Sequence, residues 1–245
     1  MRTVPLSAVR NRLLLALPTT DLCGILPLME LVTLRQRQML TEPNWPIQHI
    51  YFIETGAASV FSRGKQPVEI AMVGRFGMIG LPVVLGTNKA PFRSAVQLSA
   101  QALRLSARNF CSAMAEHPRL SEVLLKYVQF RLIVEAQAVF CNTKHRLEQR
   151  LAQWLLKAHD CIDGDKITAS HELLSRMLAV RRAGITRALG TMTEQGIIHN
   201  NRCCIEIIDR EKLSESTCEC YQFVRDEYRR LIPLTGCSLS TGTGC

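Results

Sequence analysis

The sequence has no run of about 18 consecutive apolar residues, the length that a membrane-spanning helix requires. Its N-terminal apolar run, Leu13–Leu17, is short and lacks the cleavage site of a secretory signal, so we expect Met1–Leu17 to be a helix of the mature protein. Ten cysteines in 245 residues are about 4% of the chain, below the roughly 8–10% of disulfide-stapled secreted domains. We therefore expect a reducing, cytoplasmic location and no membrane partner.

Signatures of catalysis are also lacking. The six histidines are dispersed and form neither a metal motif nor a nucleophile-and-base set. The glycines from Gly74 to Gly80 do not have the spacing of a dinucleotide-binding fingerprint, and no βαβ unit surrounds them. The sequence therefore predicts that the protein is not an enzyme and has no catalytic residue and no metal site.

Acidic residues are scarce relative to basic ones. Thirty Lys and Arg against 21 Asp and Glu leave a net charge of +9, which favours a polyanionic partner such as nucleic acid. Hydrophobic residues make up 47% and charged residues 21% of the chain, as in ordinary globular proteins. A length of 245 residues is consistent with two domains.

Between about Ile25 and Leu105, short apolar runs are separated by turn residues, which predicts a meander of short antiparallel strands. The clearest predicted strands are Ile50–Glu54, Ala58–Ser62, Val68–Met72 and Ala95–Leu98.

After Ser106 the apolar residues recur every three or four positions, which predicts helix. Residues 120–140 contain neither Gly nor Pro, so one long helix is expected there. Its apolar seam consists of Leu120, Val123, Tyr127, Phe130, Val134 and Cys141. Two interpretations remain open: a core helix beneath the strands, which the periodicity favours, or the contact of a parallel homodimer.

Residues 167–198 have the length and spacing of a helix-turn-helix, with the turn at Ala179-Val180. Two sets of apolar side chains would pack the two helices: Leu173, Leu174, Met177 and Leu178, then Ile185, Leu189 and Met192. Arg181, Arg182, Thr186 and Arg187 are then left on the exposed front of the second helix. Because residues 176–187 contain four arginines and no carboxylate, a local positive field is expected there. Arginine can read guanine in a major groove and can hold phosphates.

Three stretches carry a resemblance to a known family. Met177–Arg182 and Ile185–Leu189 resemble the winged helix-turn-helix of the CRP/FNR superfamily of bacterial transcription regulators, and Val73–Gly80 resembles that superfamily's cyclic-nucleotide-binding β-roll. The resemblance implies an α+β fold with an N-terminal β-roll of the jelly-roll type, a long dimerisation helix and a C-terminal winged helix. The implied boundaries are 1–112 for the sensor, 113–143 for the dimerisation helix, 144–234 for the DNA-binding domain and 235–245 for a flexible tail.

The resemblance also implies a sequence-specific transcription regulator, with double-stranded DNA, a second copy of the chain and RNA polymerase as partners. The operator would be an inverted repeat, because each half of a symmetric dimer reads one half-site. We expect Arg182 to read bases and Arg181 and Arg187 to contact bases or phosphates. The remaining candidates would position the DNA backbone: Thr186, Asn200, Asn201 and Arg202.

The effector site of the nucleotide-binding members would correspond to Gly77, Ile79, Gly80, Arg93 and Ser94. Glycines let backbone amides approach an anion, and an arginine binds phosphate. Leu81, however, stands where those members have a carboxylate for the ribose hydroxyl. A β-roll whose glycines only make turns is therefore favoured over cyclic nucleotide binding, and another small anionic effector stays open. No cofactor is assigned.

The cysteines leave an alternative function open. Only Cys23 lies in the first 110 residues, so the N-terminal thiolate set of an iron–sulfur sensor is lacking. We interpret Cys203 and Cys204 as small apolar fillers of a wing strand. Cys218 and Cys220 would serve a thiol- or metal-responsive regulator. A second alternative is a protein-interaction module with a degenerate sensor domain, whose basic helix binds an acidic partner.

Overall fold

The computed structural model describes residues 4–65 and 67–234, so the predicted tail at 235–245 lies outside the described residues. The N-terminal segment is not the single helix that we expected. It consists of η1 (Leu6–Ala8), α1 (Arg12–Leu15), α2 (Thr19–Ile25) and η2 (Leu26–Leu28). Asn11 interrupts the segment, because its side chain caps α1 through Leu13 N and Leu14 N. The same side chain donates to Ile53 O at 2.9 Å and to Gly77 O at 2.8 Å, which fixes α1 against the strands.

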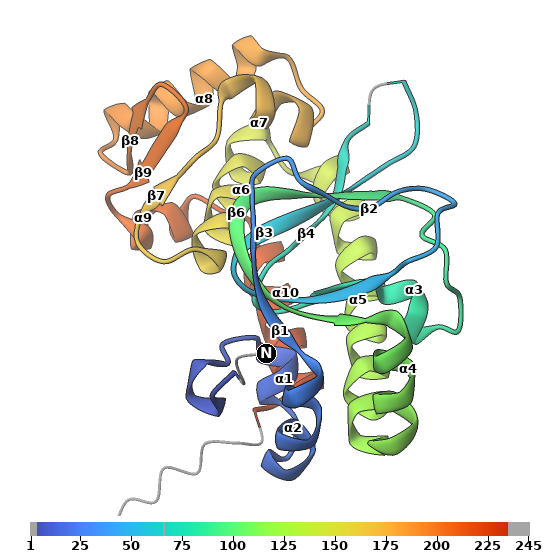
Figure 1. Cartoon of the computed structure of the whole chain (residues 1–245). Coiled ribbons are helices and arrows are strands. Elements are labelled where there is room, and N and C mark those ends of the chain that lie inside the picture. Colours follow the sequence, from blue (N-terminus) through green and yellow to red (C-terminus); the bar gives the residue numbers. More distant parts are fainter. Residues whose placement is uncertain (1–3, 66, 235–245) are drawn as a thin grey trace, which may run out of the picture.

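A six-stranded antiparallel sheet forms the N-terminal half, with the order β1-β6-β3-β4, while β2 pairs with β6 and β5 with β3 (Figure 1). The strands are β1 (Glu30–Leu34), β2 (Met39–Thr41), β3 (His49–Phe61), β4 (Glu69–Val73), β5 (Met78–Ile79) and β6 (Arg93–Ser106). The predicted meander is wrong, because β3 and β4 are the one pair of neighbours in this described sheet that are consecutive in the chain. The interleaved order is instead that of a β-roll.

β3 replaces two strands that we predicted separately, Ile50–Glu54 and Ala58–Ser62. The pairing with β6 shifts register between Ile53 and Ala58, so the ladder bends there without ending. Gly56 makes this possible: its φ is +75°, and a Cβ at this position would lie 2.2 Å from Ser99 O. The break that we expected between the two predicted strands is therefore a bulge within one long strand.

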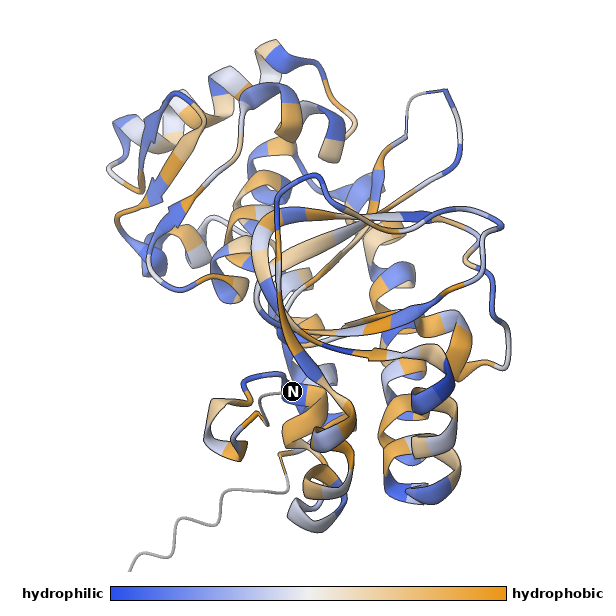
Figure 2. Ribbon diagram, in the orientation of Figure 1, coloured by the Kyte–Doolittle hydropathy of each residue, from blue (hydrophilic) through white to orange (hydrophobic). Residues whose placement is uncertain are grey.

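Helices cover the sheet: α3 (Leu81–Val84), α4 (Ala107–Glu116) and the 27-residue α5 (Pro118–Lys144). α4 and α5 carry both hydrophilic and hydrophobic residues, as expected for helices that bury one face (Figure 2). The seam that we identified on α5 packs inside the chain, where Leu120, Tyr127 and Phe130 join the main core. The core-helix interpretation of that seam is therefore correct.

A second apolar row of α5 is left uncovered by the chain. Leu125 is 56% exposed, and Leu132 and Val139 are each 67% exposed. These three residues follow one another at intervals of seven, so they lie on one side of the helix. Such a heptad interval is typical of a helix that pairs with a second helix.

The C-terminal half contains α6 (Leu147–Cys161), α7 (His171–Met177), α8 (Arg182–Glu194), α9 (Arg210–Glu215) and a small sheet in the order β7-β9-β8. The strands of this sheet are β7 (Lys166–Ile167), β8 (Ile198–Asn201) and β9 (Cys204–Ile207). Its position to one side of the large sheet is seen in Figure 1.

One further helix, α10 (Glu219–Leu231), was not predicted and packs against α5. Tyr228 lies in its last turn, with its ring centroid 5.0 Å from that of Phe130 and 5.4 Å from that of Phe76 in edge-on contacts. The sequence did contain a signal, because Tyr221, Val224, Tyr228 and Leu231 recur at intervals of three and four.

α6 joins the two halves. It packs against β3, and its buried apolar side chains belong to a hydrophobic cluster that also contains Ala57 and Leu98 of the large sheet. Trp154 Nε1 of α6 donates to Glu69 Oε1 of β4 at 3.2 Å. After α6, Asp163 accepts two bonds from Arg10, at 2.5 and 2.6 Å. The C-terminal half is therefore attached to the sheet by both apolar and ionic contacts.

Within the described part of the chain, no helix combines the length and the apolar character needed to cross a bilayer. The predicted fold class, an α+β chain with a β-roll, a long helix and a winged helix-turn-helix, is confirmed.

Candidate nucleic-acid interface

Helices α7 and α8 form a helix-turn-helix whose inner face is apolar, as predicted. Leu174, Ile185 and Leu189 are fully buried, and Met177, Leu178 and Met192 are nearly so. Ser170 caps α7 by accepting from Leu173 N at 3.1 Å. The turn contains Ala179 at φ +52°, a left-handed conformation that redirects the chain between the helices. Gly196, at φ +69°, follows the end of α8 as a C-terminal cap.

The arginines predicted to contact DNA lie on the exposed side of this unit. Arg181, Arg182 and Arg187 are all exposed, and none of them forms an ion pair with any carboxylate that the structure describes. The neighbouring Arg176 makes only a loose pair with Glu172, at 3.8 Å between Nε and Oε1. The positive charge at the start of α8 is therefore available to an external anion. Backbone amides at this helix end add to the attraction.

Thr186 and Asn200, which we expected to contact the DNA backbone, are both hydrogen-bonded to His171. Thr186 Oγ1 lies 3.0 Å from His171 Nδ1, and Asn200 Nδ2 lies 3.2 Å from His171 Nε2. This chain of hydrogen bonds is satisfied when His171 is neutral with its proton on Nδ1, because Asn200 then donates to Nε2. His171 thus connects α7, the front of α8 and strand β8. Sequence analysis missed it, since a single histidine carries no pattern.

The turn between β8 and β9 forms the wing, in which Asn201 and Arg202 are exposed. The interpretation of Cys203 as an apolar filler is wrong, because Cys203 is exposed in this turn with φ +59°. Cys204 begins β9 and is half-buried. The four-residue turn needs a left-handed residue, and this requirement overrides the strand alternation that we assumed.

The five effector candidates do not share one pocket. Ile79 pairs with Tyr51 at the start of β3, whereas Arg93 pairs with Phe61 at its end, on the other edge of the strand. The space at Gly77 is occupied, since a Cβ there would lie 2.2 Å from Tyr127 Oη.

Gly80 has φ +110° and lies against Ile50 at the start of the four-residue α3. Ser94 is buried and bonds Thr41 Oγ1 at 2.7 Å. Gly77 therefore permits close packing against Tyr127, and Gly80 permits the turn before α3.

Arg93 instead faces a cleft that it shares with the helix-turn-helix. This cleft, of about 1210 Å³, lies between the edge of the large sheet and α7. Its basic residues come from both halves of the chain: Arg37, Lys65, Arg93, Arg176 and Arg181. Its lining includes a single carboxylate, that of Glu172, among the residues the structure describes. One sensor candidate and one DNA-contact candidate are thus brought together.

Comparison with known proteins places this geometry in a class. The model of the Crp-like helix-turn-helix domain family matches residues 149–216. No curated protein sequence gives a significant match. Among solved structures, FixK2 of Bradyrhizobium japonicum is similar, with a TM-score of 0.65 and 14% identity over 78% of this chain and 98% of that chain.

Two more solved structures show the same fold. The c-di-GMP responsive global regulator CLP of Xanthomonas campestris has a TM-score of 0.60 and 13% identity, over 78% of this chain and 99% of that chain. A CRP-family transcriptional regulator of Thermus thermophilus has a TM-score of 0.60 and 16% identity, over 76% of this chain and 95% of that chain.

The matched domain is of the helix-turn-helix class, and the chain as a whole has the fold of solved transcription regulators. Within that class, residues 149–216 are a Crp-like helix-turn-helix domain, and the chain has the architecture of the CRP/FNR superfamily. The resemblance inferred from the sequence is confirmed.

Proposed function

We propose that the protein acts in the cytoplasm as a homodimeric regulator that binds an inverted-repeat operator and recruits or blocks RNA polymerase. The observation that carries the proposal is the exposed row of Arg181, Arg182 and Arg187 at the start of α8. The buried core of the helix-turn-helix holds this row, and no carboxylate of residues 4–65 or 67–234 pairs with it. Arg182 reads base edges from the start of α8, since a guanidinium can bond both acceptors of guanine. Asn201 and Arg202 of the wing contact the flanking phosphates.

The uncovered row of α5 supports the homodimer. Leu125, Leu132 and Val139 present apolar surface at heptad spacing, and a second copy of the same helix buries it symmetrically. The dimer contact is therefore assigned to this row, and no longer to the seam that packs inside the chain. Two recognition helices then face successive major grooves, about one helical turn apart.

The experiment that tests the operator is selection of bound fragments from genomic DNA by the full-length chain. The expected result is enrichment of one palindromic sequence, with affinity that falls steeply as salt is added. A chain that binds an acidic protein through the same helix would enrich no half-site spacing. Loss of all DNA retention at low ionic strength would contradict the proposal.

We assign control of DNA binding to a small anion in the cleft that Arg93 shares with Arg181. Five basic side chains converge there against one carboxylate, so an anion with two or more charges bridges the sheet and the helix-turn-helix. Calorimetric titration with cyclic AMP, cyclic GMP and cyclic di-GMP tests this assignment. Binding that Arg93→Ala abolishes, and Arg119→Ala on α5 leaves intact, is expected for the active compound. Silence for all three compounds would remove cyclic nucleotides from the proposal.

A further inference from the structure

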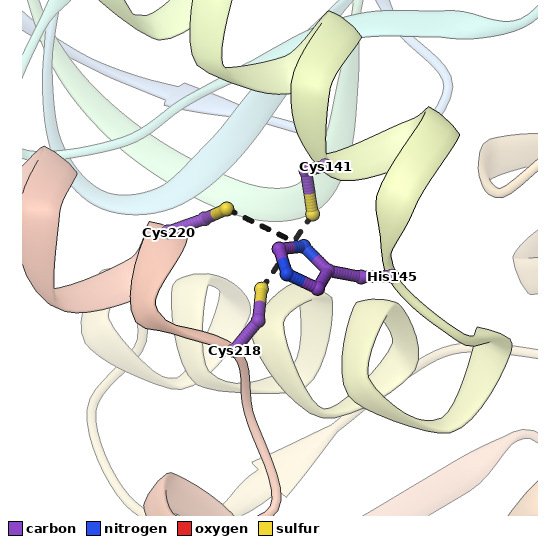
Figure 3. Close-up of side chains that lie close together, drawn as sticks. All are labelled: Cys141, His145, Cys218 and Cys220. Carbon is purple, nitrogen blue, oxygen red and sulfur yellow. Dashed lines mark hydrogen bonds between the residues drawn. The ribbon is translucent and has the colours of Figure 1, made fainter.

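Four side chains with metal-ligand chemistry meet where α5 ends and α10 begins. Cys141 belongs to the last turn of α5, and His145 follows that helix. Cys218 is the N-cap of α10, and Cys220 lies in its first turn. Their potential ligand atoms all lie within 4.8 Å of one another, and Figure 3 shows the three sulfur atoms and the imidazole converging on one point. The two halves of the cluster are separated by about seventy residues of sequence, so its assembly depends on how α10 docks.

The spacing of these atoms fits a tetrahedron around a single ion. With Zn–S of about 2.3 Å and Zn–N of about 2.0 Å, tetrahedral zinc separates two sulfur ligands by about 3.8 Å and sulfur from nitrogen by about 3.5 Å. Cys141 Sγ lies 3.6 Å from Cys218 Sγ, and Cys220 Sγ lies 3.5 Å from His145 Nδ1. Three cysteines and one histidine are also an established ligand set of closed, structural zinc sites.

The surroundings orient the ligands as a metal site requires. His145 Nε2 lies 3.2 Å from Glu219 Oε1, so this ring nitrogen carries the proton and Nδ1 points toward the three sulfur atoms. Gln137 Nε2 donates to Cys220 Sγ at 3.1 Å, a contact that stabilises thiolate charge. Exposure of Cys141, Cys218 and Cys220 is 4%, 5% and 0%, so water does not compete for the ion.

Three other interpretations account for less of this geometry. If the cysteines served only as small apolar side chains, their burial would be explained, but the contacts from Cys220 to His145 and from His145 to Glu219 would not. A disulfide requires about 2.05 Å between sulfur atoms, whereas the sulfur atoms of Cys141 and Cys218 are 3.6 Å apart. An iron–sulfur cluster distributes its thiolates over several irons and needs a wider cage than one in which all ligand atoms lie within 4.8 Å.

We propose that Cys141, His145, Cys218 and Cys220 bind one zinc-like divalent cation in a closed tetrahedral site. Soft thiolate ligands with one imidazole select such an ion over magnesium or calcium, which prefer oxygen. All four positions are supplied by the protein, so the site serves structure and not catalysis.

The site lies at the junction of α5, α6 and α10. His145 is the first of the two residues between α5, which ends at Lys144, and α6, which begins at Leu147. The ion therefore fixes the junction between the long helix and the DNA-binding half, and it ties α10 to that junction at the same time. Loss of the ion frees this junction, so DNA affinity becomes dependent on metal supply.

Metal analysis of the full-length protein, purified without chelators or affinity metals, tests the proposal. The expected content is one zinc per chain, removable by a strong chelator under reducing conditions. Reloading with Co²⁺ then gives the intense visible bands of tetrahedral cobalt and a thiolate-to-cobalt charge-transfer band in the near ultraviolet. Pale octahedral cobalt spectra, or no uptake of either ion, would overturn the site.

Matched variants separate binding from folding. Cys220→Ser is expected to abolish the charge-transfer band at stoichiometric Co²⁺. Cys161→Ala removes a different buried thiol, on α6 and outside the cluster, and is expected to bind Co²⁺ as the unaltered protein does. Glu219→Gln keeps every ligand but weakens the second-shell bond to His145, so zinc affinity should fall by about 10- to 100-fold.

Glu219 is 69% exposed, so this variant remains informative if Cys220→Ser fails to fold. Equal zinc affinity in Glu219→Gln and in the unaltered chain would contradict the proposed role of Glu219 in orienting His145. Intact cobalt bands in a folded Cys220→Ser protein would overturn the assigned ligand set. A Cys141–Cys218 disulfide in metal-free protein kept under reducing conditions would replace the metal site by a redox pair.

Discussion

Glu54 holds the N-terminal segment through Asn11. Its Oε2 accepts the backbone N–H of Asn11 at 3.1 Å and also that of Arg10, at the start of α1. The other carboxylate oxygen, Oε1, is buried and has no partner in the described part of the chain. Burial dominates over these bonds and raises the pKa of Glu54 from 4.5 to about 7.

The first prediction concerns the pH dependence of stability. Because the pKa of Glu54 is raised on folding, its contribution is fully present below about pH 4.5 and is lost as the pH rises through 7. Glu54→Gln keeps an acceptor for the two amides and removes the titration. Urea unfolding should show the unaltered protein losing up to about 3 kcal/mol relative to Glu54→Gln between pH 5 and 8. Parallel pH profiles for the two proteins would contradict this assignment.

Gly77 supplies a prediction about packing. A methyl group at this position meets the hydroxyl of the buried Tyr127, so Gly77→Ala should lower the free energy of unfolding by about 1–3 kcal/mol. Gly190, in α8, is the matched control, because a Cβ there meets no described atom within 4 Å. Gly190→Ala should raise that free energy by about 0.5–1 kcal/mol through helix propensity. Denaturant titration of both variants measures the difference, and equal stability would show that Tyr127 moves aside freely.

The base-reading role that we propose for Arg182 leads to a third prediction. Arg182→Ala should weaken operator binding by about 1–3 kcal/mol and relax the preference at one base-pair position. Arg202→Ala on the wing should weaken binding to all sequences alike and reduce the salt dependence by about one phosphate contact. Fluorescence anisotropy with the selected operator and with single-base variants measures both effects. Arg119→Ala, an exposed arginine on α5, is the control and should bind as the unaltered protein does.

The fourth prediction tests the dimer contact. Leu132 lies at the centre of the uncovered row of α5, so Leu132→Asp should weaken dimerisation by at least about 2 kcal/mol. Sedimentation equilibrium should then find monomers at concentrations where the unaltered chain is dimeric. Leu31→Asp changes another exposed leucine, on β1 and 53% exposed, and should leave the dimer intact. A Leu132→Asp protein that stays dimeric would place the contact elsewhere.

Local patterns predicted the helix-turn-helix well. The apolar spacing from Leu173 to Met192 is short-range and strictly periodic, so it specified both helices and their buried faces. The arginines on the front of α8 followed from the same spacing. Strand pairing was harder, because the neighbours of β6 lie far away in sequence. A run of alternating residues cannot indicate whether β6 pairs with β1 or β4.

The sequence predicted neither the Cys/His cluster nor the packing at Gly77 and Gly80, because both depend on long-range contacts. Cys141 is a seam residue by spacing, and only the return of α10 brings Cys218 and Cys220 beside it. Gly77 and Gly80 have the pattern of an anion-binding loop, yet Tyr127 and Ile50 occupy the space above them. In both cases the deciding neighbour comes from a distant segment of the chain.

The bond between Trp154 and Glu69 makes the protein its own fluorescent reporter. The chain has two tryptophans: Trp45 is 72% exposed, whereas Trp154 is 5% exposed at the junction of α6 with the sheet. A turn of the DNA-binding half away from the sheet must break the indole hydrogen bond and admit water to that ring. With Trp45→Phe as background, the emission of Trp154 reports any such turn in real time and without an added label.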